Sequence, residues 1–174
     1  MTFLKSKRGD LPDMMIFVIT IFVFAIGLLV MAFVIPSITD GLEGAGLNAS
    51  TEGGAAIDQL ADLGTNGLQK GFFLLSVGLI MSTMITSFLT RVHPIFLFMY
   101  IFFLGLSVFI GGYLGNAFEQ IATSPVLAST LGGQGLISVW MQNIVLITLV
   151  VGALSMIIIF AKFSTFGSNS GGQM

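Results

Sequence analysis

The chain has 174 residues, of which 55% are hydrophobic and only 8% are charged, and its mean hydropathy is +1.03. A soluble domain carries roughly 25% charged residues, because its surface must stay hydrated. Six basic and eight acidic side chains cannot cover a soluble domain of this size, so a bilayer must solvate most of the chain. The net charge of −2 provides no basic face for nucleic acid, and the absence of cysteine excludes disulfides, thiol nucleophiles and thiolate metal sites.

Four long uncharged segments predict four transmembrane helices, at residues 14–35, 71–90, 94–114 and 136–161. At about 1.5 Å rise per residue, each is long enough to cross a hydrocarbon layer about 30 Å thick. None alternates as the strand of a membrane barrel does, and lipid cannot satisfy free backbone groups, so each segment must be helical. The sequence therefore predicts an all-α polytopic membrane protein with one transmembrane domain over 14–163.

Basic residues set the expected orientation of these spans. Five of the six fall on one side of the predicted membrane: Lys5, Lys7, Arg8, Arg91 and Lys162. Because positive residues are retained on the cytoplasmic side, we predict that the N-terminal segment 1–13 and a disordered tail at 164–174 are both cytoplasmic. The first span is longer than the apolar region of a signal peptide and no A-x-A site follows it, which favours an uncleaved anchor. A prepilin leader, the other alternative, does not suit a chain with three further spans.

The connection between the second and third spans is the clearest local signal. Pro94 lacks an N–H and therefore suits the first turn of a helix, and it pushes His93 toward extended geometry. We expect the second and third helices to form a tight antiparallel hairpin. Arg91 and His93 would then lie at the depth of the lipid headgroups, where they are candidate contacts for headgroups or a partner.

Two outer loops are predicted, at residues 36–70 and 115–135, and they carry most of the acidic residues. Within the first, residues 55–63 predict a short helix that rests on the membrane surface or a partner; a solvated acidic loop is the alternative. Asn48 begins a triplet that matches a glycosylation acceptor.

Lys70 and Glu119 fall at the outer ends of two different spans. We therefore expect these two side chains to be neighbours that either cap the outer face of the bundle or contact a partner there. Solvated interfacial residues are the alternative.

Small residues recur every four positions along three of the spans. They are Gly78, Ser82 and Thr86 in the second span, Ser107, Gly111 and Gly115 in the third, and Thr148 and Gly152 in the fourth. Small side chains at this spacing let helix backbones approach closely. The pattern predicts helix–helix interfaces, either within one chain or in a homo-oligomer.

No Asp, Glu, Lys, Arg or His lies inside the four apolar segments. Charges within a membrane usually mark ion pathways, proton relays or catalytic sites. His93 is the only histidine, and no serine or threonine in the spans has a neighbouring histidine or lysine base. The sequence therefore predicts no enzyme, no metal site and no cofactor.

Three non-enzymatic roles remain. Uncharged spans and polar outer loops favour a structural or assembly protein of a membrane. A small channel, holin-like or transport component is an alternative, for which the second span supplies the candidate pore lining: Ser76, Ser82, Thr83, Thr86 and Ser87. An accessory subunit of a membrane complex is the third.

Several short motifs occur together at the ends of the spans: Lys7-Arg8-Gly9-Asp10, His93-Pro94, Asn116-Ala117-Phe118-Glu119 and Met141-Gln142-Asn143. Their arrangement resembles small polytopic membrane proteins of membrane-containing icosahedral viruses of bacteria and archaea. The resemblance implies a virion protein in the lipid layer beneath a capsid, with no enzymatic role. Its outer acidic loops would then contact capsid or vertex proteins.

Overall fold

The structure is a computed structural model that describes residues 13–89 and 94–168. Four helices in these ranges are long and apolar enough to cross a membrane, which confirms the predicted all-α class with four spans. They belong to α1 (Asp13–Gly44), α3 (Leu68–Leu89), α4 (Pro94–Ala122) and α7 (Ile144–Ser168). The expectations for residues 1–12, for Arg91 and His93, and for 169–174 lie outside the described residues.

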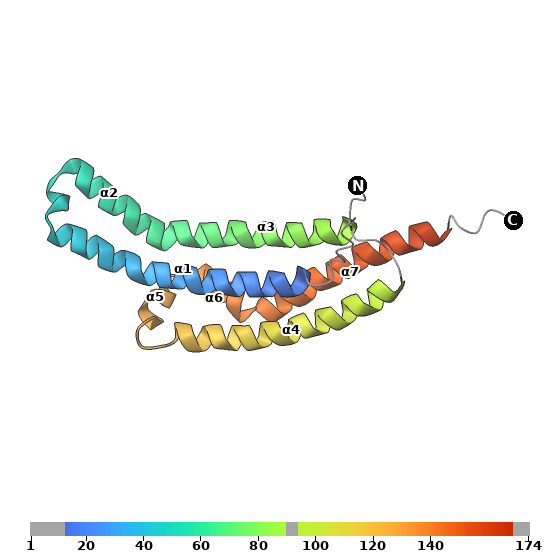
Figure 1. Cartoon of the computed structure of the whole chain (residues 1–174). Coiled ribbons are helices and arrows are strands. Elements are labelled where there is room, and N and C mark those ends of the chain that lie inside the picture. The colour runs from blue at the N-terminus through green and yellow to red at the C-terminus, as the bar shows by residue number, and fades with distance from the viewer. Residues whose placement is uncertain (1–12, 90–93, 169–174) are drawn as a thin grey trace, which may run out of the picture.

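The helices α1 and α7 form the middle of the bundle (Figure 1). Each packs on both α3 and α4, which therefore lie on opposite sides of the pair. The helix α4 begins at Pro94, soon after α3 ends at Leu89, but within the described residues the two helices do not pack along each other as the predicted tight hairpin. In the described part of the chain, their extensive contacts are made with α1 and α7 instead.

The core runs along one face of α1. Its buried residues recur every three or four positions, which places them on one side of a helix: Met14, Phe17, Val18, Ile21, Ala25, Leu29, Ala32 and Ile35. Large apolar side chains also point away from the bundle, as with Leu74 (77% exposed), Phe109 (76%) and Phe98 (72%). An apolar exterior of this kind is stable in lipid and unstable in water, which agrees with the membrane assignment.

The predicted outer loop at 36–70 is largely helical. The helix α1 continues past Pro36 to Gly44, and the 3-10 helix η1 (Leu47–Ala49) leads into α2 (Thr51–Asp62). A π-helix, η2 (Leu63–Gly67), then joins α2 directly to α3. The end of α1, η1, α2 and η2 together (residues 38–67) project beyond the other helices, and we call them the distal hairpin (Figure 1).

Local chemistry explains why the distal hairpin folds back on itself. Gly46 has a left-handed backbone (φ 79°), which glycine adopts without steric cost. This conformation turns the chain away from the axis of α1. Ser50 caps α2, because its Oγ accepts a hydrogen bond of 3.1 Å from the N–H of Gly53. Glu52 lies in the first turn of α2, where the helix dipole favours a negative charge.

The predicted fourth span is divided. After α4 come α5 (Ala128–Gly132) and α6 (Gly135–Gln142), and the helix is interrupted at Asn143 before α7 begins. The side-chain Nδ2 of Asn143 donates to the carbonyl of Val139 at 2.8 Å, a local bond that competes with helix continuation. At the other end α7 continues to Ser168, so residues 164–168 of the predicted disordered tail are helical.

Candidate functional site

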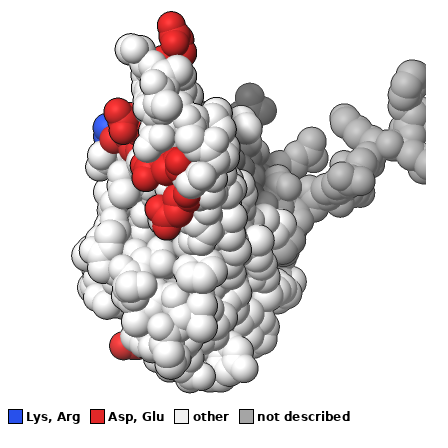
Figure 2. Space-filling view, turned by 90° about the vertical axis from the view of Figure 1, so that its left-hand side faces the viewer, with Lys and Arg blue, Asp and Glu red and all other residues white. Residues whose placement is uncertain are grey.

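The distal hairpin carries most of the charge that the structure describes. Between residues 38 and 70 the chain has one basic residue, Lys70, and five acidic residues: Asp40, Glu43, Glu52, Asp58 and Asp62. All five acidic side chains are exposed. Figure 2 shows carboxylates gathered over the projecting end of the molecule. The short helix predicted at 55–63 lies within α2, so Asp58 and Asp62 are one helical turn apart.

Two glutamines fasten the hairpin to the bundle, and we call them the glutamine clamp. Gln134, only 2% exposed, donates from Nε2 to the carbonyl of Gly64 at 2.8 Å. Gln69 donates to the carbonyl of Gly133 at 2.8 Å and accepts from the N–H of Leu136 at 3.0 Å. The clamp thus joins η2 and α3 to the turn between α5 and α6, segments more than 60 residues apart in the sequence.

Gly64 makes the clamp possible. A Cβ atom at this position would lie 2.7 Å from Cγ2 of Ile35, so only glycine lets η2 approach α1 this closely. Gly64 lies in a π-helix, whose wider turn departs from the regular i→i−4 bonding pattern. Its carbonyl is the one that Gln134 reaches. Sequence reasoning missed the clamp: the only available signal was a glutamine between glycines at 132–135, which predicts a polar turn and no specific partner.

The small residues of the third and fourth spans meet between α4 and α7. A Cβ added to Gly111 would lie 3.7 Å from Oγ1 of Thr148, and one added to Gly115 would lie 3.1 Å from Cγ2 of Ile144. A Cβ at Gly152 would overlap the end of the Leu104 side chain. These contacts lie within one chain, which agrees with the intramolecular interpretation of the pattern.

Hydroxyls in the same interface are fully buried. Ser107 and Thr148 are both 0% exposed, and each donates to a carbonyl of its own helix, at 2.8 and 2.7 Å. A buried hydroxyl must find a partner inside the protein, because lipid offers none. The local bonds leave both side chains small and satisfied at the contact.

The candidate packing residues of the second span lie elsewhere. Gly78 and Ser82 are exposed on the outer face of α3, and a Cβ at Gly78 would meet nothing within 4 Å. Thr86 is half-buried and donates to the carbonyl of Ser82 at 2.9 Å. The structure therefore does not bring this set against another helix of the described chain as it does for α4 and α7.

The inward face of α3 carries three other hydroxyls, Ser76, Thr83 and Ser87, beside the buried Leu68 and Phe72. Thr83 and Ser87 donate to carbonyls one turn back, at 2.9 and 2.8 Å. The five residues proposed as a pore lining are thus divided between two faces: these three point inward, whereas Ser82 and Thr86 lie further out.

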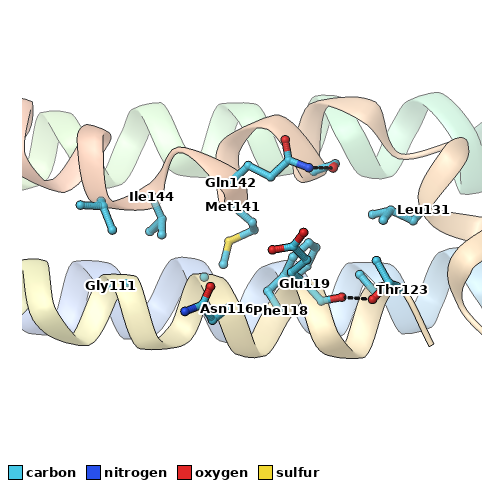
Figure 3. A pocket seen from close by; sticks show the side chains of 14 residues that line it. Gly111, Asn116, Phe118, Glu119, Thr123, Leu131, Met141, Gln142 and Ile144 are labelled. Carbon is cyan, nitrogen blue, oxygen red and sulfur yellow. Dashed lines mark hydrogen bonds between the residues drawn. The ribbon is translucent and has the colours of Figure 1, made fainter.

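A side cavity of about 370 Å³ lies between α4 and the break that separates α6 from α7 (Figure 3). Glu119 and Asn116 of α4 and Gln142 of α6 line it, together with apolar residues such as Met141 and Ile144. Lys70 is not among the lining residues. Lys70 lies on α3 and Glu119 on α4, and α1 and α7 separate these two helices. The structure therefore does not bring together the expected pair of Lys70 and Glu119.

At the opposite end of the bundle, Lys162 of α7 binds the end of α3. Its Nζ donates to the carbonyl of Phe88 at 2.8 Å and lies 5.6 Å from the centre of the Phe88 ring. The last carbonyls of a helix lack partners within that helix and carry a partial negative charge. The cation of Lys162 therefore caps the C-terminus of α3.

Among the described residues, no group of three or more His, Asp and Glu side chains is arranged to hold a metal ion. Comparison with protein-family models, with curated proteins and with solved structures finds no match to the chain. The membrane assignment therefore rests on the length and apolar composition of the helices. The chain is an integral membrane protein with four spans.

Proposed function

We propose that the protein is a non-enzymatic structural or assembly component of a membrane, which presents the distal hairpin as an acidic docking element to a neighbouring protein. The observation that carries this proposal is the projection of a helical pair, residues 38–67, with five acidic residues and no basic residue beyond the apolar bundle. A protein that only had to span the bilayer would not need this element.

Helix lengths support the projection. The apolar helix Met14–Gly44 has 31 residues and the continuous helical stretch Thr51–Leu89 has 39, which correspond to about 46 and 58 Å at 1.5 Å per residue. The hydrocarbon layer is only about 30 Å thick. Both helices therefore extend beyond the hydrocarbon, and their excess lies at the acidic end.

The glutamine clamp supports a docking role in a second way. It holds η2 and the start of α3 by hydrogen bonds to Gly64 and Gly133. A recognition element that is already ordered loses less conformational entropy on binding than a flexible loop does. The hairpin is thus prepared for a specific contact.

Charge indicates the chemistry of the partner. An excess of carboxylates attracts a basic protein surface, accelerates association and makes binding sensitive to salt. The distribution of basic residues predicts that the hairpin lies on the outer side of the membrane. In a virion, the setting that the sequence resemblance implies, the partner would be a basic region of a capsid or vertex protein.

The test uses the full chain in its source membrane or particle. Solubilised wild-type protein should migrate in a complex larger than itself on native gels, and about 0.5 M salt should weaken that complex, because ions screen exposed charges. Replacing all five hairpin carboxylates by amides should release the protein from the complex. The control is Glu119→Gln, which removes one carboxylate from α4, outside the hairpin, and should retain the complex.

Two results would refute the docking role. One is wild-type protein that migrates alone from its source membrane. The other is a neutralised hairpin that leaves the complex intact while far-UV circular dichroism shows the native helix content. If a catalytic polypeptide co-purifies in the complex, the protein is instead an accessory subunit of a membrane enzyme.

A channel is the second candidate function, and the inward hydroxyls of α3 are the observation that favours it. Ser76, Thr83 and Ser87 form a polar line on a helix that otherwise faces apolar neighbours. Ion flux through liposomes that contain the purified chain would support a channel if it falls with Thr83→Val and not with Ser82→Ala on the exposed face. A docking protein gives no flux in either case.

A further inference from the structure

The side cavity occupies a particular depth in the membrane. The exposed apolar surface of α4 continues through Phe109 (76% exposed) to Tyr113 (73% exposed), and Asn116 and Glu119 follow within two turns. Tyrosine is typical of the boundary between hydrocarbon and headgroups. The polar residues of the cavity therefore lie at the depth of the headgroups, on the side of the distal hairpin.

The lining of the cavity changes in character along the bundle. Toward the membrane centre it consists of Gly111, Gly112 and Val145, whereas toward the distal end polar residues on α4 and α6 stand beside apolar ones such as Phe118 and Leu131. Those polar residues are Asn116, Glu119, Thr123, Ser138 and Gln142. A cavity of about 370 Å³ with this gradient matches an amphipathic molecule, with its apolar part toward the membrane and its polar part toward the distal end.

Glu119 gives the cavity its charge. The view in Figure 3 shows its carboxylate between α4 and α6, facing the space that Met141 and Gln142 border from the other side. None of the described residues that line the cavity is basic. A carboxylate that faces such a space is stabilised by a cationic ligand, because the local dielectric constant at a membrane boundary is lower than that of water.

The helix break supplies donors beside this carboxylate. Asn143 interrupts the regular pattern between α6 and α7, so α7 begins at Ile144, which lines the cavity with Val145. The first N–H groups of a helix have no partner within that helix. The side-chain amide of Gln142 donates one hydrogen bond from Nε2 to Oγ of Ser138 at 3.3 Å, which leaves its second N–H as a donor. With the amide of Asn116, the cavity thus offers neutral donors for an anionic group as well as a carboxylate for a cation.

We propose that the side cavity binds the headgroup of a phospholipid that carries a primary ammonium, with the ammonium on Glu119 and the phosphate on the neutral donors of α6 and α7. A primary ammonium has three N–H donors for a carboxylate and amide oxygens. A quaternary ammonium has none, and the cages that bind it are built from several aromatic rings. Phe118 is the only aromatic residue among the described residues that line this cavity. This inference does not depend on the docking role of the distal hairpin.

The test measures binding of short-chain lipids to the purified full chain in detergent by native mass spectrometry and by the shift in melting temperature. The probes are dihexanoyl phosphatidylethanolamine, phosphatidylcholine and phosphatidylglycerol, with free phosphoethanolamine as the headgroup without acyl chains. Wild-type protein should bind the ethanolamine lipid about tenfold more tightly than the choline lipid, as expected for one charge-assisted hydrogen-bonded pair. Free phosphoethanolamine should bind more weakly than the lipid, because the apolar part of the cavity then stays empty.

Three variants separate the headgroup site from general lipid affinity. Glu119→Gln should remove the preference for ethanolamine, and Glu119→Lys should transfer it to phosphatidylglycerol. The matched control Glu52→Gln lies in the distal hairpin and should bind as the wild type does. Glu119 is exposed, so these substitutions should leave the fold intact, as far-UV circular dichroism checks.

Three outcomes would overturn the proposal. Equal binding of the ethanolamine and choline lipids by the wild type would show that the cavity does not recognise the ammonium. A preference that survives both Glu119 substitutions would place the headgroup elsewhere. Tighter binding of free phosphoethanolamine than of the lipid would identify a soluble phosphoamine, and not a lipid, as the ligand.

Discussion

The membrane bundle and the distal hairpin are held together by different interactions. In the bundle, α4 and α7 approach through Gly111, Gly115 and Gly152, and two fully buried hydroxyls bond to their own helices. One half-buried hydroxyl, that of Tyr100, donates across the contact to the carbonyl of Gly152 at 3.2 Å. At the distal hairpin, the side chains of Gln69 and Gln134 bond to backbone groups far away in the sequence. The first region depends mainly on the shape of the helix contacts and the second mainly on a few polar bonds.

The solvent explains this difference. Lipid tails are as apolar as leucine, so helices inside a bilayer gain little from burying apolar surface and must gain from close packing. Near the headgroups, water competes for every exposed polar group, and a hydrogen bond contributes most where water is excluded. Gln134 is only 2% exposed, which is why its bond to Gly64 can hold the hairpin.

The largest expected effect comes from breaking the bundle contact. Gly152→Leu would force a side chain into the space of Leu104 and Met14, and overpacking of this kind costs roughly 2–3 kcal/mol. The free energy of unfolding, measured by titration with a denaturing detergent, should fall by that amount. The matched control is Gly78→Leu, whose Cβ meets nothing within 4 Å. Equal losses in both variants would show that close packing of α4 and α7 does not control the stability of the bundle.

A smaller and more local effect is expected at the clamp. Gln134→Leu would leave the carbonyl of Gly64 buried without its donor, at a cost of roughly 1–2 kcal/mol. In the native state Oε1 of Gln134 is buried and has no hydrogen-bond partner among the described residues, which is unfavourable. Leucine removes this unpaired oxygen, so the net loss of stability should lie near the lower end of that range. Hydrogen exchange should accelerate in η2 and the start of α3 but not in α7. The exposed Gln59 of α2 provides the control Gln59→Leu, which should exchange at native rates.

The same contrast explains what the sequence could predict. Long uncharged segments specify spans because lipid requires a helix of a certain length, and all four were found. The small residues that meet between α4 and α7 could be predicted, because a four-residue period places them on one face of each helix. That rule does not say which face of α3 points inward, and the structure places Gly78 outward and Ser76 inward.

The distal region could not be predicted in the same way. The outer loop was predicted to begin at residue 36, yet α1 continues to Gly44. In this stretch Thr39 is buried, and its Oγ1 donates to the carbonyl of Pro36 at 2.8 Å. The clamp joins residues about 64 to 70 positions apart, and no local pattern records such a pair. The cavity beside Glu119 also depends on the break at Asn143, within a segment whose hydropathy predicts an unbroken helix.

The smallest expected effect concerns Lys162, at the end of the bundle opposite the hairpin. This residue belongs to the bundle but forms a polar bond to backbone, as the clamp does. Lys162 donates to the carbonyl of Phe88 as the clamp glutamines donate to backbone, and its ammonium also lies near the Phe88 ring, 5.6 Å from the ring centre. Lys162→Met keeps the apolar stem and removes the cation, so it should cost about 0.5–1 kcal/mol, the usual contribution of a cation at a helix C-terminus. The loss should shrink in high salt, because ions screen a partly exposed charge.

Lys70→Met is the matched control for this last prediction, because it removes the same charge from an exposed position at the other end of α3. It should leave the free energy of unfolding unchanged. Lys162→Arg should restore most of the stability, because a guanidinium also donates to a carbonyl and also lies well over an aromatic ring. If Lys162→Met and Lys70→Met are equally stable in low salt, the end of α3 is held by apolar packing alone, and the hydrogen bond from Lys162 to the carbonyl of Phe88 does not contribute to stability.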